Sequence, residues 1–202
     1  MQKGENKNHP KKGESIMVEP IRDLKAIKAI KKLLASNPRD YCLFVVGINT
    51  NLRASDLCRI TAGDVRHLKE GDELAMKEKK TKKGRRLTLN KSAIEAIQAH
   101  LSSGQYDDDH TPLFRSQRGK KALTVPSVHR LVKSWCGPEG INLKGNYGSH
   151  TLRKTFGYHH RLAGTSIFEL MEMFNHSTQG QTLKYLCVQS EEIKSAYLRV
   201  NL

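Results

Sequence analysis

Arginine, histidine and tyrosine recur along the second half of the chain at spacings that could serve one reaction. His150 and Arg153 stand three residues apart, so a helix starting here presents an imidazole and a guanidinium on one face. His176 follows Arg153 after 23 residues, and Tyr185 follows His176 after nine. Upstream, Arg53 lies where a turn is expected to lead into a helix. A site made from these groups would attract an anion.

A phosphodiester matches this set of groups. Its two non-bridging oxygens gain charge in the transition state, and arginine forks fit those oxygens in shape and sign. A nucleophile and a proton donor must also lie in line on opposite sides of the phosphorus. Lys80 lies in a strongly basic stretch between the two arginines. Together the arginines, the histidines, the lysine and the tyrosine meet this demand without a metal.

Each residue also has an ordinary structural interpretation. An arginine at the start of a helix commonly pairs with a nearby acid, which for Arg53 would be Asp56. A His-x-x-Arg pair is commonly structural or solvent-exposed, and a tyrosine such as Tyr185 commonly packs in a core with its hydroxyl bonded. The order and spacing of the whole set, within a strongly basic chain, favour a shared site over these separate interpretations.

Most of the elements that must position these groups are predicted to be helices. Residues 1–20 lack a periodic apolar pattern and are expected to be a flexible lead-in. From Ile21 to Leu34 apolar residues recur every three or four positions, which predicts an amphipathic helix. A second helix is predicted from Arg39 to about Thr50, and a third begins near Ala54. Further helices are predicted over residues 92–101, 125–135, 150–162, 166–174, 178–188 and 191–198.

Two of these helices begin with the pattern of a capping box. Ser92 precedes Glu95 by three residues, and Ser166 precedes Glu169 by three, so serine and glutamate can satisfy each other's backbone amides. With the strands described below, the predicted fold class is mainly α with a small antiparallel β-sheet (α+β). Residues 21–202 are predicted to form one domain.

The charge of the chain indicates a polyanionic partner. Its 202 residues include 35 Lys and Arg against 20 Asp and Glu, which gives a net charge of +15. Such an excess repels itself in a free protein and is typical of proteins that bind nucleic acid. Apolar residues make up 37% of the chain, enough for a folded domain rather than a disordered basic tail.

A basic hairpin is predicted in the middle of the chain. Glu73–Met76 and Arg85–Leu89 have the texture of two short strands, and the polar stretch between them would form the turn. Residues 76–91 hold eight basic residues and one acid, Glu78. The side chains of this hairpin expected to contact DNA are Lys79, Lys82, Lys83, Arg85 and Arg86.

Several other classes of protein are disfavoured. The longest apolar run, residues 42–46, is far too short to span a membrane, and the first 20 residues lack the apolar core of a secretory signal. The four cysteines form no Cys-x-x-Cys pair, so free thiols in the cytoplasm are expected. The histidine spacings do not suit zinc, and no glycine-rich phosphate loop is present. We expect a cytoplasmic protein without a metal or another cofactor.

At four places the sequence resembles the tyrosine recombinases, also called phage-type integrases. The resemblance covers about Ile21 to Ser190. It is carried by Leu52-Arg53-x-Ser55-Asp56-Leu57, Lys80-Thr81-Lys82, His150-x-Leu152-Arg153-Lys154-Thr155-Phe156, and Asn175-His176-Ser177 to Thr182-x-x-Tyr185. Asn51 stands where the family usually has Gly, and Phe174-Asn175 stands where it usually has Leu-Gly. Because only about 20 residues precede the first helix, the family's separate amino-terminal core-binding domain is expected to be absent.

The resemblance implies a role for each matched residue. Tyr185 would be the nucleophile, leaving a 3′-phosphotyrosyl link and a free 5′-hydroxyl. Arg53 and Arg153 would bind the scissile phosphate. Lys80 would protonate the departing 5′-oxygen, a role that a shift in the hairpin would pass to a neighbouring lysine. Two histidines complete the set: His150 would act in proton transfer, and His176 would hydrogen-bond the phosphate.

The resemblance also implies a partner and an assembly. The chain would be the catalytic domain of a site-specific recombinase of a mobile element, acting on double-stranded DNA as a homotetramer, with a monomer as the alternative for the chain in isolation. Residues 188–202 are the candidates for a segment exchanged between subunits. Two alternatives stay open: a type IB topoisomerase, which shares the same reacting groups, and a non-enzymatic DNA-binding protein that retains the fold.

Overall fold

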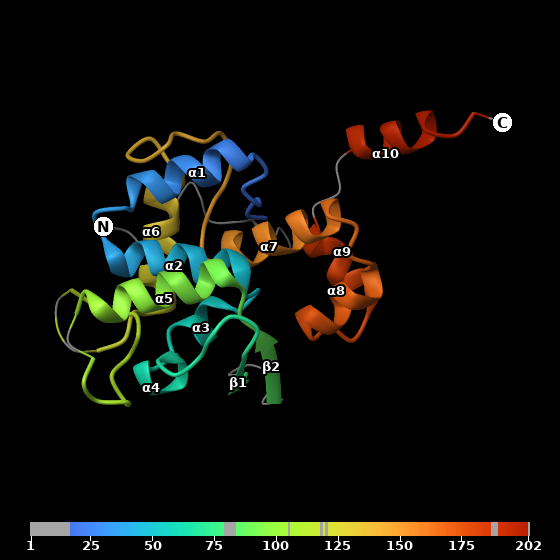
Figure 1. Cartoon of the computed structure of the whole chain (residues 1–202). Helices are drawn as coiled ribbons and strands as arrows, with labels where there is room; N and C mark the ends of the chain where they lie inside the picture. The colour runs from blue at the N-terminus through green and yellow to red at the C-terminus, as the bar shows by residue number, and fades with distance from the viewer. Residues whose placement is uncertain are drawn as a thin grey trace, which may run out of the picture.

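The computed structural model describes residues 17–78, 84–104, 106–117, 119, 121–186 and 190–201. Its helices and strands in chain order are α1 (Leu24–Leu33), α2 (Pro38–Asn49), α3 (Ala54–Leu57), α4 (Ala62–Val65), β1 (Glu73–Lys77), β2 (Gly84–Thr88), α5 (Lys91–Ser102), α6 (Val125–Cys136), α7 (Thr151–Leu162), α8 (Ile167–Phe174), α9 (Gln179–Leu186) and α10 (Ser190–Leu198). A mainly helical chain with one two-stranded antiparallel sheet confirms the predicted fold class (Figure 1).

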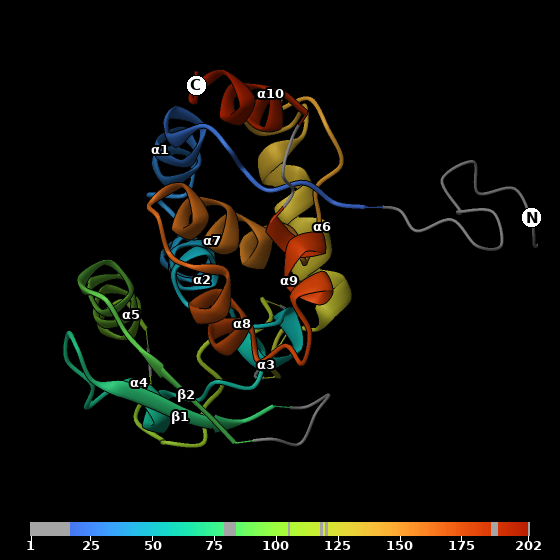
Figure 2. The same cartoon turned by 90° about the vertical axis from the view of Figure 1, so that its right-hand side faces the viewer.

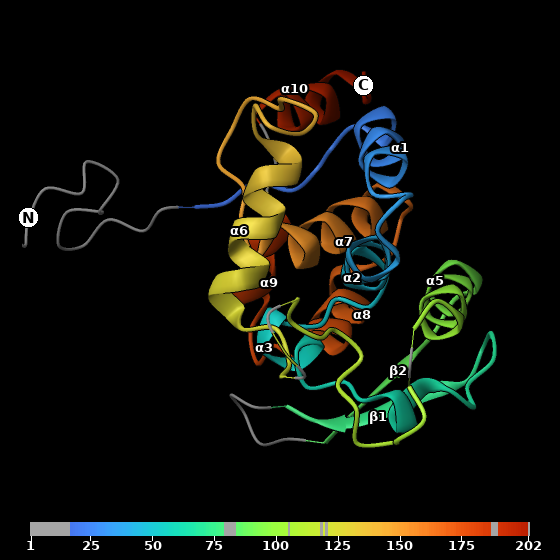
Figure 3. The ribbon, with the colours of Figure 1, turned by 90° about the vertical axis from the view of Figure 1, so that its left-hand side faces the viewer.

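Helix α2 is the centre of the main core. Its residues Cys42 to Val46 are at most 1% exposed, so this helix is apolar on every side and must be covered all round. Helices α1, α5 and α7 pack against it, and Figures 2 and 3 show it beside α7, on the side that faces α5. A Cβ on Gly47 would lie 2.6 Å from Leu152 Cδ1. This close approach fixes α7, which carries Arg153, against the centre of the core.

Side-chain caps explain where most helices begin. Asp23 caps α1, and Asn37 caps α2, whose first residue is Pro38. The capping box predicted at Ser166 and Glu169 is confirmed at the start of α8. The one predicted at Ser92 and Glu95 is wrong. Helix α5 begins at Lys91, and its cap is Asn90, whose side chain accepts a hydrogen bond from the Ala93 amide at 3.0 Å. Asparagine caps as well as serine does, and it lies two residues earlier.

The third predicted helix is four residues long and is followed by a helix that was not predicted. Helix α3 ends at Leu57, and buried Ile60 lies in the connection to α4. Thr61 and Asp64 form the capping box that opens α4. Each of these helices is four residues long, too short for an apolar period to reveal it.

Both strands of the hairpin agree with the prediction to within one residue at each end. β1 and β2 pair antiparallel, with Lys77 opposite Gly84 and Glu73 opposite Thr88. Along β2 the exposure of the side chains alternates, because successive residues of a strand point to opposite faces. Arg85 and Arg86 therefore point to opposite sides of the hairpin.

A second apolar cluster holds α8 and α9 on α7. Its buried members are Phe156, Leu170, Phe174 and Leu186. A Cβ on Gly157 would lie 2.6 Å from Phe174 Cζ, so the absence of a side chain lets α8 approach α7. Figure 1 shows α8 and α9 together at one end of α7, with α10 standing apart from the rest of the molecule.

Two smaller expectations concern thiols and membranes. Cys42, Cys58 and Cys136 are free, as predicted for these three. Among the described residues, no helix combines the length and the apolar character needed to cross a membrane.

Candidate active site

Arg153 is the most buried arginine of the site. It lies in the first turn of α7 and is 1% exposed. Its Nη1 donates to the carbonyl of Asn51 at 2.5 Å, and its Nη2 donates to the carbonyl of Phe174 at 2.7 Å. Burial, together with the charges of Arg53 and Arg85, lowers the pKa of Arg153 to about 9. Its Nε has no hydrogen-bond acceptor within the described part of the chain, and since a guanidinium has five N–H donors, the two carbonyl bonds leave donors for an anion.

Arg53 reaches the same place from the start of α3. It is the residue before the helix, in an extended conformation, and its Nη1 lies 2.6 Å from Glu78 Oε2. Arg53 thus forms its ion pair with Glu78, at the end of β1, rather than with Asp56 of the helix that Arg53 precedes. The preceding Asn51 has φ 47°. A left-handed turn thus separates α2 from Arg53, whose charge, after burial, contributes to lowering the pKa of Arg153.

Tyr185 lies at the other side of the arginines, near the end of α9. Its Oη is 3.3 Å from His150 Nδ1. Its ring lies 5.6 Å from the guanidinium of Arg153 and 5.9 Å from the ammonium of Lys154. Since Tyr185 is partly exposed, its hydroxyl can meet a large substrate while a histidine and two cations lie beside it. That is the environment a phenol needs to act as a nucleophile.

His176 joins the arginines to the tyrosine. Its ring stacks on Phe174 at 5.2 Å and lies 5.2 Å from the ring of Tyr185. Its Nδ1 is 3.0 Å from Thr182 Oγ1. Burial, followed by the charges of Arg153 and Arg53, lowers the pKa of His176 to about 4. At neutral pH it is therefore an uncharged hydrogen-bonding group.

The predicted hairpin residues fall into three groups. Lys79, Lys80, Lys82 and Lys83 lie outside the described residues. Arg86 is on the outer face of β2, with 76% of its side chain exposed beside Glu73. Arg85 points the other way, with 7% of its side chain exposed and its Nη1 3.1 Å from Glu78 Oε1. Both arginines were expected to contact DNA, and the structure places them on opposite sides of the hairpin.

Three residues at the site were not singled out from the sequence as site residues. Glu78 pairs with Arg53 and Arg85, Asn175 donates to Glu78 at 3.3 Å, and Lys154 is buried beside Tyr185. Glu78 had a signal in the sequence: it is the single acid among the basic residues of the hairpin. Asn175 and Lys154 were visible only as parts of the family motifs.

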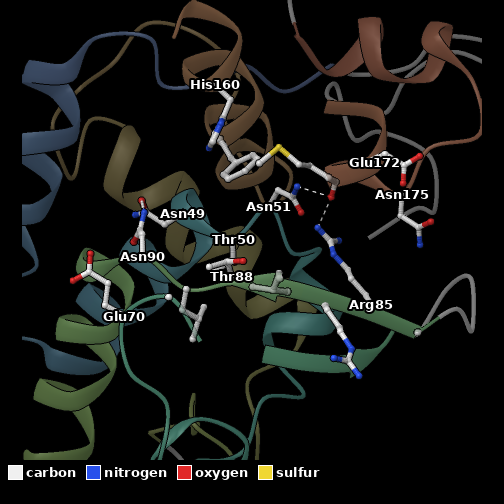
Figure 4. Close-up of a pocket in the computed structure, with 17 residues that line it drawn as sticks. Asn49, Thr50, Asn51, Glu70, Arg85, Thr88, Asn90, His160, Glu172 and Asn175 are labelled. Carbon is white, nitrogen blue, oxygen red and sulfur yellow. Dashed lines mark hydrogen bonds between the residues drawn. The ribbon is translucent and has the colours of Figure 1, made fainter. Parts of the chain in front are cut away.

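A cavity of about 640 Å³ lies behind the arginines (Figure 4). It is lined by β2, by the end of α2 and by the facing parts of α7 and α8, and Arg85, Asn51 and Asn175 border it. Figure 4 shows Asn51 and Arg85 converging on one carbonyl, that of Met173. Tyr185 and Arg53 do not line this cavity. The cavity therefore lies beside the proposed phosphate site and is not that site.

Five of the six predicted reacting groups thus meet in one place: Arg53, His150, Arg153, His176 and Tyr185. A mainly helical domain thus gathers two arginines, two histidines and a tyrosine, the groups that phosphoryl transfer with a tyrosine nucleophile would require.

The chain belongs to the phage integrase family, whose sequence pattern matches residues 21–192. It is 35% identical over 185 residues to the probable integrase/recombinase YoeC of Bacillus subtilis (strain 168), covering 90% of this chain and 96% of YoeC. The expected membership of the tyrosine recombinases is confirmed.

Solved structures agree on the fold. The XerA recombinase superposes with a TM-score of 0.74 at 21% identity, over 95% of this chain and 66% of that one. The XerH site-specific recombinase, solved bound to a palindromic difH substrate, has a TM-score of 0.73 at 20% identity, over 92% of this chain and 53% of that one. The chain thus spans between half and two-thirds of these Xer recombinases.

Proposed function

We propose that this protein is a site-specific recombinase that cleaves and rejoins DNA strands through a 3′-phosphotyrosyl intermediate. The observation that carries the proposal is the position of Tyr185 Oη, 3.3 Å from His150 and beside Arg153 and His176. A phosphate seated on the arginines would meet this hydroxyl directly. A DNA-binding protein without catalytic activity would not need a partly exposed phenol beside these groups.

The proposed reaction is a transesterification. The Tyr185 oxygen attacks phosphorus, its proton passes to His150, and the bond from phosphorus to the 5′-oxygen breaks. Arg53 and Arg153 bind the non-bridging oxygens as they gain charge, and neutral His176 donates a hydrogen bond to them. Lys80 protonates the departing 5′-oxygen. The phosphotyrosine keeps the energy of the broken bond, so rejoining needs no ATP and no cofactor.

The proposed substrate is double-stranded DNA in the cytoplasm, with Lys79, Lys82, Lys83 and Arg86 on the strand backbones. The net charge of +15 supports this substrate, and so does the DNA-bound state of the similar XerH. YoeC is named a probable integrase/recombinase, which favours recombination over the relaxation performed by a type IB topoisomerase and fits an origin in a mobile element.

The proposed assembly is a tetramer on DNA, in which residues 21–202 form the catalytic domain and its segment 188–202 passes from one subunit to the next. Four large apolar residues support this role because each is more than half exposed: Ile193, Tyr197, Leu198 and Val200. Such exposure at the end of a chain is costly in water unless a partner covers it.

Trapping the covalent intermediate tests the proposal. The full chain is incubated with nicked duplexes of random sequence, in which the short 5′-hydroxyl fragment diffuses away and rejoining fails. A denaturation-resistant protein–DNA adduct at a limited set of sequences is expected. An adduct spread evenly over all sequences, with relaxation of supercoiled DNA, would support the topoisomerase alternative. Binding without any adduct would support the non-enzymatic one.

A further inference from the structure

Glu78 is a buried carboxylate enclosed by cationic and amide groups. It directly follows β1, and its side chain is fully buried. Its Oε2 lies 2.6 Å from Arg53 Nη1, and its Oε1 lies 3.1 Å from Arg85 Nη1. The amide of Asn175 donates to Oε2 at 3.3 Å. One side chain thus joins the start of α3, the strand β2 and the end of α8.

The partners of Glu78 are themselves fixed. Arg85 donates its other nitrogen to the carbonyl of Met173, which also accepts from the side chain of Asn51. Asn175 ends α8 in a left-handed conformation with φ 54°. A buried carboxylate that bridges two arginines restricts the orientation of each, whereas a long side chain without such a partner samples many rotamers.

The charge balance also explains why an acid is needed here. Burial, followed by the charges of Arg53 and Arg85, lowers the pKa of Arg153, and burial together with the charge of Arg53 lowers the pKa of Arg85. Like charges at such distances repel, and burial strengthens the repulsion. Glu78 offsets part of it without touching Arg153, whose own donors go to backbone carbonyls. Arg53 can then stay beside Arg153 before a phosphate binds.

We propose that Glu78 is a positioning residue for strand cleavage: it holds Arg53 in the orientation that receives the scissile phosphate, and Arg85 and Asn175 hold Glu78. The inference rests on the proposed function, since it assigns Arg53 to a phosphate. It adds a residue that contacts no DNA and acts through an arginine. It also gives Arg85 a place inside the site rather than on the duplex.

The test compares single-turnover cleavage of the nicked duplex by the full chain and by Glu78→Gln. Glutamine keeps the size of the side chain but removes its charge and puts an amide where one arginine must donate. Cleavage should slow by about 10- to 100-fold, as expected for a misplaced reacting group, while DNA affinity stays unchanged or rises. Asn175→Gly keeps the left-handed turn and removes the amide. It should also slow cleavage, by a smaller factor than Glu78→Gln.

Glu73→Gln is the matched control, because Glu73 lies on the same strand and pairs with Arg86 in a solvent-exposed contact. It should cleave at the wild-type rate. The effect of Glu78→Gln on cleavage by the Arg53→Ala variant distinguishes a positioning role from a merely structural one. If Glu78 acts through Arg53, adding Glu78→Gln to Arg53→Ala should slow cleavage by less than about twofold.

Three results would overturn the inference while wild-type protein still forms its adduct. Faster cleavage by Glu78→Gln would make Glu78 a competitor of the phosphate for Arg53. Cleavage by Glu78→Gln at the wild-type rate would show that Glu78 does not position Arg53. A full 10-fold or greater additional loss in the Arg53→Ala background, on the order of the single-variant effect, would make its effect independent of Arg53. Failure of the wild-type protein to form an adduct would instead reject the proposed function itself.

Discussion

Asparagine occupies two left-handed turns beside the arginines. Asn51 has φ 47° and Asn175 has φ 54°, a conformation that glycine adopts freely and asparagine tolerates better than most residues. The family pattern usually has glycine at both places, so the backbone needed there is preserved. The asparagine side chains add bonds that glycine cannot make, to the Met173 carbonyl and to Glu78. These departures therefore strengthen the site's supports without removing a reacting group.

Removing either arginine should separate catalysis from stability. Arg153→Ala should slow cleavage by about 100- to 1000-fold, the usual cost of a lost donor to developing charge. It should also lower the free energy of unfolding by about 2–4 kcal/mol, because it leaves a cavity and two unsatisfied carbonyls. Arg53→Ala should cost as much in cleavage and less in stability, since Glu78 keeps Arg85 as a partner. Urea unfolding and single-turnover cleavage measure the two quantities, and near-normal cleavage by either folded variant would reject the phosphate-binding role.

The low pKa of His176 predicts how stability changes with pH. Its pKa falls from 6.5 to about 4 in the folded protein, so between these values the unfolded chain binds more protons. The free energy of unfolding therefore decreases as pH falls through this window. Wild-type protein should lose more stability between pH 7 and pH 4 than His176→Gln, as measured by urea unfolding. Parallel curves for the two proteins would show that His176 is not held neutral.

The residues that meet at the site could be predicted from the sequence because their types suit a phosphodiester and their motifs resemble those of the tyrosine recombinases. Their supports could not. Glu78 was visible as a lone acid, but its partners come from residues 53, 85 and 175, and such distant pairings depend on the tertiary fold. The pairing of Arg53 with Glu78 rather than Asp56 is the clearest example.

At the scale of elements, periodic patterns predicted the long helices well and the short ones poorly. Helices α2 and α7 have long apolar faces, whereas α4 has one turn and is fixed mainly by its cap. The hairpin shows a further limit. Composition indicates a basic surface, but the alternation of a strand sends Arg85 inward and Arg86 outward, and only the register decides which goes where.

The contact between α7 and α8 depends on a glycine. In Gly157→Ala the new Cβ would meet the ring of Phe174 at 2.6 Å, so the free energy of unfolding should fall by about 1–3 kcal/mol. Cleavage should fall as well, because Phe174 supports Arg153 and His176. Gly180→Ala in α9 has no atom within 4 Å of the new Cβ and should instead stabilise the protein by about 0.4–1 kcal/mol. Equal effects of the two substitutions on urea unfolding would contradict this packing.

At the scale of the whole molecule, the excess of positive charge predicts how DNA affinity responds to salt. Each neutralised phosphate contributes a slope of about −0.9 in log affinity against log salt. Changing Lys82, Lys83 and Arg86 together to Gln should reduce the slope by about 2–3, and adding Arg85→Gln should change it little, because Arg85 is buried. Salt titrations of duplex binding measure this, and a further drop of about 1 on changing Arg85 would place it on the duplex instead.

The central claim is that the phenol oxygen of Tyr185 forms the covalent bond to the DNA phosphate. The most direct measurement digests the trapped adduct with trypsin and nuclease and identifies the modified peptide by mass spectrometry. A nucleotide joined through its 3′-phosphate to Tyr185, and no adduct from a folded Tyr185→Phe variant that still binds DNA, is the predicted result. An adduct that persists in Tyr185→Phe and maps to another tyrosine, such as Tyr158 or Tyr197, would contradict the account.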